Sequence, residues 1–305
     1  MITETQRIID QIEERDGLYI GRWRRPVNPG LHAKGSIHED ASAERLGFRG
    51  GLVAGSIHSE MFPPLLLKAF GQRWFEHGNL SLYFVEPTLD REEVRAIVAV
   101  PPAGASDVQV QVWAERPNGN RICEGTAAVG DPPEPSALLA RDLDRFPPGE
   151  LRILADASVG DQFPEVEVSV TQEEMDRRLE VTTDPLPWYR GDSPWEGAVA
   201  TTNNLVVAMM QPCNAYLQGR RGAGVVGLFG AIELRNINGP VLVGKPYRAG
   251  GHLINLGQSA KTEYLWYEAY MEDEASRRTA EMRMMLRFMK ASSPAYQQDS
   301  AGPAQ

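Results

Sequence analysis

The residues best suited to chemistry lie between Ser36 and Ser56, in the segment SIHEDASAERLGFRGGLVAGS. His38 and Asp40 stand two residues apart at the start of a short helical pattern, and a glycine-rich turn leads from there into an apolar helical pattern near Gly55. A histidine can exchange protons near neutral pH, and helix-start N–H groups can bind a carbonyl oxygen. The spacing predicts an acid–base group beside a carbonyl-binding site. Both ionisable side chains could instead only cap the helix that follows.

The apolar pattern after this turn carries polar residues that need an explanation. His58 lies about one turn from Gly55, so the two residues can share a helix face. Buried polar groups require a partner or a cavity. We therefore predict that Gly55, Ser56, His58 and Glu60 contact a substrate. A buried network of hydrogen bonds is the alternative for His58 and Glu60.

Hydrophobic periodicity predicts the elements that position these residues in the first half. We expect helices over residues 4–14, 40–46 and 55–70, with Pro63-Pro64 interrupting the last one. Strands are expected over residues 80–85, 93–100, 107–115 and 121–129, with an Asn-Gly turn joining the last two. A helix followed by an antiparallel meander predicts a sheet wrapped around that helix.

The second half repeats this order of elements. A capping box at Thr171 and Glu174 opens a helix after a strand over 165–170. A longer helix over 201–216 precedes strands over 225–234, 245–256, 260–271 and 278–289. We expect a first domain over 1–130, a second over 151–291, a proline-rich linker with one helical turn over 131–150, and a disordered tail over 292–305.

The bulk composition narrows the class of protein. The net charge of -10 over 305 residues argues against a nucleic-acid binder, which needs a basic face. Cys123 and Cys213 are expected to be buried free thiols, and the absence of a Cys/His cluster argues against a metal. No segment is apolar over the length that a bilayer requires, and no phosphate-binding glycine motif is present. We expect a cytoplasmic protein without a cofactor or a membrane partner.

The segment around His38 resembles the MaoC-like hydratases of the hotdog superfamily. Their motif runs Asp-x-Asn-Pro-x-His-x-Asp, then a small residue, Gly-Phe, and a glycine turn into a central helix. His38-Glu39-Asp40, Gly47-Phe48 and the run from Gly51 to Gly55 match its later parts. The resemblance implies an α+β double hotdog, with two tandem units that each have a long central helix wrapped by an antiparallel sheet.

The sequence departs from this motif at the family's catalytic aspartate. Counting back from His38, that position is Ala33, and Gly35-Ser36 replaces the Asn-Pro pair. In the second half Asp184 is kept, but Tyr189 stands where the histidine would be. Asp40, Glu60 and Asp184 are therefore the candidates to replace the missing carboxylate.

The resemblance implies a hydratase or dehydratase that acts on an acyl thioester, such as a CoA thioester, or on a related conjugated carbonyl compound. His38 would be the main acid–base group, Asp40 its helper, and Gly55 the carbonyl binder. Three alternatives stay open: an isomerase, a hotdog thioesterase in which Glu60 activates water, and an acyl-binding protein that has lost catalysis. Exposed sheet edges would also allow a homodimer.

Overall fold

The computed structural model of the chain describes residues 3–145 and 147–297. Every strand that alternation predicts is present, with bounds shifted by a few residues, and two short strands precede them. The strands are β1 (Glu13–Arg15), β2 (Leu18–Ile20), β3 (Gly78–Phe84), β4 (Arg95–Ala99), β5 (Val108–Glu115), β6 (Arg121–Val129), β7 (Gln162–Val168), β8 (Gly227–Asn236), β9 (Tyr247–Gln258), β10 (Thr262–Glu272) and β11 (Arg278–Met289).

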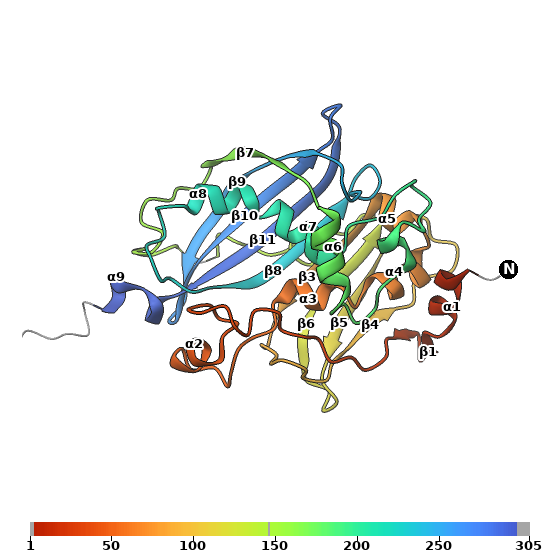
Figure 1. Ribbon diagram of the computed structural model, residues 1–305, viewed down its shortest axis with the longest axis horizontal. Helices are drawn as coiled ribbons and strands as arrows, with labels where there is room; N and C mark the ends of the chain where they lie inside the picture. The colour runs from red at the N-terminus through yellow and green to blue at the C-terminus, as the bar shows by residue number, and fades with distance from the viewer. Residues whose placement is uncertain (1–2, 146, 298–305) are drawn as a thin grey trace, which may run out of the picture.

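Within the described residues these strands form one antiparallel sheet of eleven strands (Figure 1). Their order across the sheet is β1-β2-β4-β5-β6-β3-β8-β11-β10-β9-β7. The pair β3 and β8 joins the strands of the first half of the chain to those of the second, and it is in register from Asn79 and Arg235 to Tyr83 and Ala231.

The helices are shorter than the sequence predicts. They are α1 (Glu4–Asp10), α2 (Asp40–Arg45), α3 (Gly55–Ser59), α4 (Pro63–Phe70), α5 (Arg73–His77), α6 (Gln172–Leu179), α7 (Thr202–Met209), α8 (Gln211–Leu217) and α9 (Pro294–Gln297). The helix predicted over 55–70 is divided into α3 and α4, as the proline pair indicates, because proline cannot donate within a helix. The helix predicted over 201–216 divides at Met210, and Pro212 lies in the first turn of α8.

The first predicted helix is wrong at its end. It stops at Asp10, and residues 13–15 form β1 instead. Asp16 and Gly17 both adopt positive φ, at 54° and 73°, and make a two-residue turn that pairs β1 with β2. The capping box at Thr171 is confirmed, because its side chain accepts from Glu174 N while the Glu174 carboxylate accepts from Thr171 N.

The helices α3 to α8 pack on one face of the sheet, where α6, α7 and α8 cross in front of the strands in Figure 1. Side chains alternate between faces along a strand. In β10, Leu265 and Tyr267 belong to the core beneath the helices, whereas Trp266 packs with Leu138 on the opposite face. The predicted linker therefore covers an apolar sheet face. One helical turn lies within it, where Ala140 N donates to the Ser136 carbonyl oxygen at 2.9 Å.

The described part of the predicted tail is ordered. Residues 290–292 form a 3-10 turn, α9 follows, and the Tyr296 hydroxyl donates to the buried Glu263 carboxylate at 2.6 Å. Residues 298–305 lie outside the described residues. Cys123 and Cys213 are buried free thiols, as predicted. In the described part of the chain, no helix has the length and apolar character to cross a membrane.

Candidate active site

A cavity of about 510 Å³ opens where β3 and β8 separate. Beyond the pair Tyr83 and Ala231, β3 ends, while β8 continues alone beside β11. The cavity is lined mostly by apolar side chains from both halves of the chain, and its size is ordinary for a small-molecule site. Its walls come from residues 37–38, 46–48, 52–55 with 58, and 84–88 of the first half, and from 227–230, 259–262, 287 and 289 of the second.

His38 lines this cavity, as a catalytic histidine must, and its ring has a defined tautomer. Its Nδ1 lies 2.6 Å from the carbonyl oxygen of Leu52. A carbonyl oxygen can only accept, so Nδ1 carries the proton and donates. The other ring nitrogen, Nε2, has no hydrogen-bond partner among the described residues and is left as a free acceptor.

Two glycines allow the close packing that orients His38. A Cβ atom on Gly30 would lie 2.6 Å from the Cβ atom of His38, and one on Gly51 would lie 2.1 Å from its carbonyl oxygen. Neither distance is compatible with a side chain. The chain before and after His38 therefore approaches it at positions that only glycine can occupy.

Asn28 is a positioning residue that the sequence analysis missed. It is only 2% exposed, its Nδ2 donates to the His38 carbonyl oxygen at 2.8 Å, and its Oδ1 accepts from Gly30 N at 3.0 Å. Asn28 is followed by Pro29 in the sequence, and residues 30–36 form a loop between this pair and the segment that carries His38.

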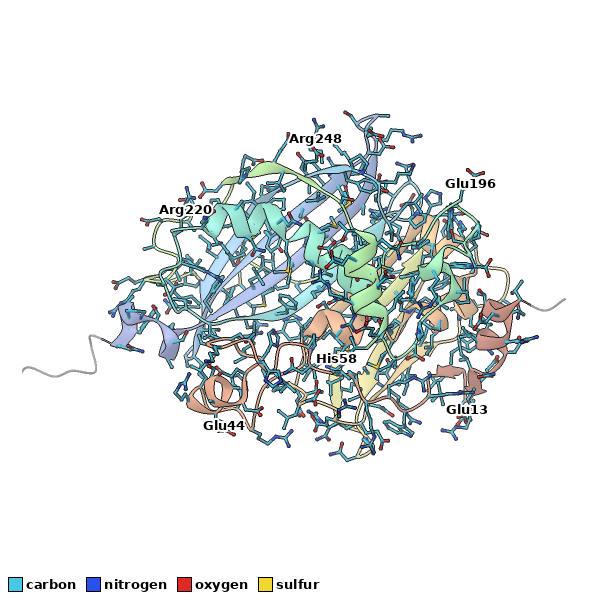
Figure 2. The ribbon with its side chains drawn as sticks, viewed as in Figure 1. Glu13, Glu44, His58, Glu196, Arg220 and Arg248 are labelled. Carbon is cyan, nitrogen blue, oxygen red and sulfur yellow. The ribbon has the colours of Figure 1, made fainter. Side chains whose placement is uncertain are left out.

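His58 lies in α3, near the middle of the molecule in Figure 2, and is 4% exposed. Its Nε2 is 2.6 Å from the hydroxyl oxygen of Thr88, while its Nδ1 is buried without a partner among the described residues. Burial and the nearby charge of Arg116 lower the pKa of His58 to about 4. His58 is therefore a neutral cavity residue at neutral pH.

His38 and His58 are held by two neighbouring backbone segments, which contain Leu52-Val53 and Thr88. Val53 N donates to the Thr88 carbonyl oxygen at 2.9 Å. His38 is bonded to Leu52 on the first segment, and His58 to the Thr88 side chain on the second. The wall that holds both rings is thus fixed at several points.

Gly55 lines the cavity at the start of α3, and Ser56 does not. The first N–H groups of a helix lack intrahelical acceptors, so the Gly55 amide can donate to a ligand. A Cβ atom on Gly55 would lie 2.4 Å from the ring of Phe84, another lining residue. The Ser56 hydroxyl instead donates to Asn203 Oδ1 at 2.8 Å, toward α7.

The three carboxylates considered as substitutes for the missing aspartate all lie away from the cavity lining. Asp40 accepts from Gly51 N at 2.7 Å and holds the glycine turn. Glu60 forms a buried ion pair with Arg178, which also keeps it from the substrate-binding position that the sequence predicts. Asp184 is paired with Arg24 at 2.5 Å. Each of these carboxylates already has a structural partner.

Among the described residues, Glu86 is the one carboxylate that lines the cavity. It is the second residue after β3, and its Oε2 accepts from Arg116 Nη1 at 2.7 Å. Arg116 also donates to Glu92 Oε1 at 2.9 Å and to the Pro87 carbonyl oxygen at 2.6 Å. One arginine therefore fixes the loop that presents Glu86. The only sequence signal for Glu86 was its position at the end of a predicted strand.

No family model and no curated protein matches the chain. Solved structures do match it. A MaoC domain protein of Chloroflexus aurantiacus, described as a dehydratase, has a TM-score of 0.61 at 10% identity, over 90% of this chain and 96% of the other. A conserved Mycobacterium tuberculosis protein with a double hotdog fold has a TM-score of 0.56 at 11% identity, over 92% and 98%. A MaoC-like dehydratase has a TM-score of 0.52 at 16% identity, over 89% and 98%.

These likenesses define the class of fold. The chain is an α+β protein with the hotdog fold, similar over most of its length to MaoC-like and double hotdog structures. The α+β hotdog fold that the resemblance around His38 implies is thereby confirmed.

Proposed function

We propose that this chain is a double hotdog hydratase or dehydratase of acyl thioesters, in which His38 is the acid–base residue. The two tandem units would be the segments ending in β3 to β6 and in β8 to β11, each with a broken central helix. The observation that carries the proposal is the His38 ring at the cavity wall. Its Nδ1 is held by Leu52, and its Nε2 is free to exchange a proton.

A hydration step can be written with these groups. His38 Nε2 removes a proton from water, the resulting hydroxide bonds to the β-carbon of an enoyl thioester, and the π electrons move toward the thioester carbonyl. The N–H of Gly55 stabilises the enolate oxygen that forms. The imidazolium then returns the proton to the α-carbon, so the product has gained one water. The reverse sequence is the dehydration.

Glu86 is the group we propose to orient the attacking water. It is the carboxylate of the cavity wall among the described residues, and its Oε2 accepts from Arg116 Nη1 at 2.7 Å. An acceptor that holds water beside His38 would take the place of the aspartate that the motif lacks.

The test is turnover of short and aromatic enoyl-CoA substrates, followed by loss of the double-bond absorbance. His38→Ala should lower kcat by about 10²- to 10⁴-fold, the usual contribution of an acid–base group. The matched control is His32→Ala, because His32 is exposed in the same loop region and lines no part of the cavity. Equal rates for wild type and His38→Ala, or release of free thiol in place of hydration, would reject the proposed function.

A further inference from the structure

The second-half wall of the cavity carries two cations, Arg287 and Lys261, for which no ion pair is found among the described residues. Arg287 is the tenth residue of β11, and its Nη2 donates to the Tyr83 hydroxyl at 2.6 Å. Its Nε is buried and has no partner. Lys261 lies in the exposed turn between β9 and β10. The protein itself leaves the charges of this wall without a counter-charge.

This arrangement is unusual for an acidic chain. The net charge is -10, so carboxylates are in excess over arginines and lysines. In contrast, Arg116, which holds the lining residue Glu86, is paired with both Glu86 and Glu92. A cation that borders a cavity of low polarity gains most from an anionic partner when water is excluded. The partner of the buried Arg287 Nε is therefore expected in the ligand, and Lys261 lies in the same cavity wall, where it can contact the same anionic group.

The two walls of the cavity lie on different sides of the sheet. Along β11, Leu286 and Phe288 belong to the core beneath the helices, whereas Met285 packs on the opposite face. Arg287 stands between Leu286 and Phe288, so alternation directs it to that opposite face. α3 and its Gly55 lie on the helix side. A ligand that spans both walls must pass through the gap where β3 and β8 separate.

The backbone beside Arg287 leaves room for its guanidinium. A Cβ atom on Gly230 of β8 would lie 2.6 Å from Met285 Sδ and 2.8 Å from Arg287 Nε, so the glycine leaves space for both of these side chains. The Tyr83 hydroxyl fixes the guanidinium from β3. The charge is therefore held in place before a ligand arrives, which reduces the entropy cost of binding it.

We propose that Arg287 and Lys261 form an anion-binding subsite, and that the substrate carries an anionic oxygen group at this end of the cavity. This inference rests on the proposed function, because His38 defines the end where the acyl carbons react. The anionic group has two chemical sources: a carboxylate at the far end of the acyl chain, or a phosphate of the thiol carrier.

The experiment measures binding by calorimetry with saturated thioether analogues, which cannot react. Four ligands are compared: the same acyl chain with and without a terminal carboxylate, each on CoA and on N-acetylcysteamine, which has no phosphate. The variants are Arg287→Gln and Lys261→Met. Their controls are Arg220→Gln, at the periphery in Figure 2, and Lys245→Met, since both control positions are exposed and lie outside the cavity lining.

If the anionic group is a carboxylate on the acyl chain, both test variants should lose about 10- to 100-fold in affinity for the carboxylated ligands on either carrier. If the anionic group is a phosphate of the carrier, the same loss should occur for the CoA ligands only. The control variants should bind like wild type. Unchanged affinities of Arg287→Gln and Lys261→Met for all four ligands would overturn the subsite, as would failure of wild type to bind any of them. If Arg287→Gln fails to fold, Lys261→Met on the exposed turn still decides the matter.

This design separates the subsite from the proposed function. Charge-selective binding without turnover of any enoyl thioester would support the subsite and reject the hydratase. Turnover that depends on His38, with a KM that is the same in wild type and both test variants, would support the hydratase and overturn the subsite.

Discussion

The ion pair between Glu60 and Arg178 allows a test of whether Glu60 stabilises the fold or binds the substrate. Glu60 caps the end of α3, Arg178 lies in α6, and the two are 2% and 7% exposed. Arg178 Nη2 donates to Glu60 Oε2 at 2.5 Å, and its Nε lies 2.9 Å from both carboxylate oxygens. This bidentate contact connects residues 118 positions apart in the chain.

Glu60→Gln removes one charge and leaves the Arg178 guanidinium buried without a counter-charge. Breaking a buried pair in this way costs about 3–5 kcal/mol of unfolding free energy. An unfolding entropy of about 2.1 cal/mol/K per residue over the chain converts this loss to a fall in Tm of about 5–8 °C. The double variant Glu60→Leu with Arg178→Met removes both charges together and should recover most of the loss.

The assay combines thermal and urea unfolding with enoyl thioester turnover, measured well below the lower Tm. We expect Glu60→Gln to lose stability and to keep the wild-type KM, because Glu60 does not line the cavity. A variant with unchanged Tm and a raised KM would refute this reasoning and restore Glu60 as a substrate contact. A double variant no more stable than Glu60→Gln would refute the charge argument alone.

Three further predictions concern the cavity and its supports. Asp40→Asn should keep activity, because its amide oxygen can still accept from Gly51 N, whereas Asp40→Ala should lose about 1 kcal/mol of stability; inactivity of the folded Asn variant would instead indicate proton transfer. Gly55→Ala should raise KM several-fold, because its Cβ would displace the Phe84 ring from the cavity wall, and an unchanged KM would contradict this. The pKa of His58 is lowered to about 4, so the unfolded chain takes up a proton there as the pH falls below about 6.5 while the folded chain does not. Between pH 7 and 4, wild type should therefore lose about 3 kcal/mol more unfolding free energy than His58→Gln in urea titrations, and equal losses would show that His58 is not buried as described.

The strands were predictable because alternation is a local signal. β5 alternates apolar and polar residues, and its predicted bounds differ from the structure by one residue. The sequence also predicted the break at Pro63-Pro64, because a missing N–H acts within one turn. The end of α1 was harder to predict, because it is fixed by the pairing of β1 with β2 and not by a local pattern. The linker was misjudged because composition does not reveal an apolar sheet face that requires a cover.

The sequence also allowed the prediction that one site contains His38, Gly55 and His58, because all three lie in or beside one short segment. Contacts between residues far apart in the sequence could not be predicted in this way. Nothing local to Glu60 indicates that Arg178 would neutralise it, and a carboxylate in an apolar helix looks the same whether it meets a ligand or an arginine. The wall formed by residues 227–230 and by Arg287 depends entirely on how β8 and β11 pack against the first half.

A loop over residues 30–36 separates Asn28 from His38. Its backbone closes in successive turns, in which Ala33 N donates to Gly30 O and Ser36 N to Ala33 O, so the chain leaves Asn28 and returns to His38. Extra residues in a closed surface loop cost little free energy, and spacing counted through them loses its structural meaning. Counted back from His38, the aspartate position of the motif is Ala33, and counted back from Asn28 it is Pro26. Neither residue has a carboxylate, so the acid–base chemistry we propose must rest on His38 and on a group from elsewhere in the chain, and the loop after β3 supplies Glu86 to the same cavity.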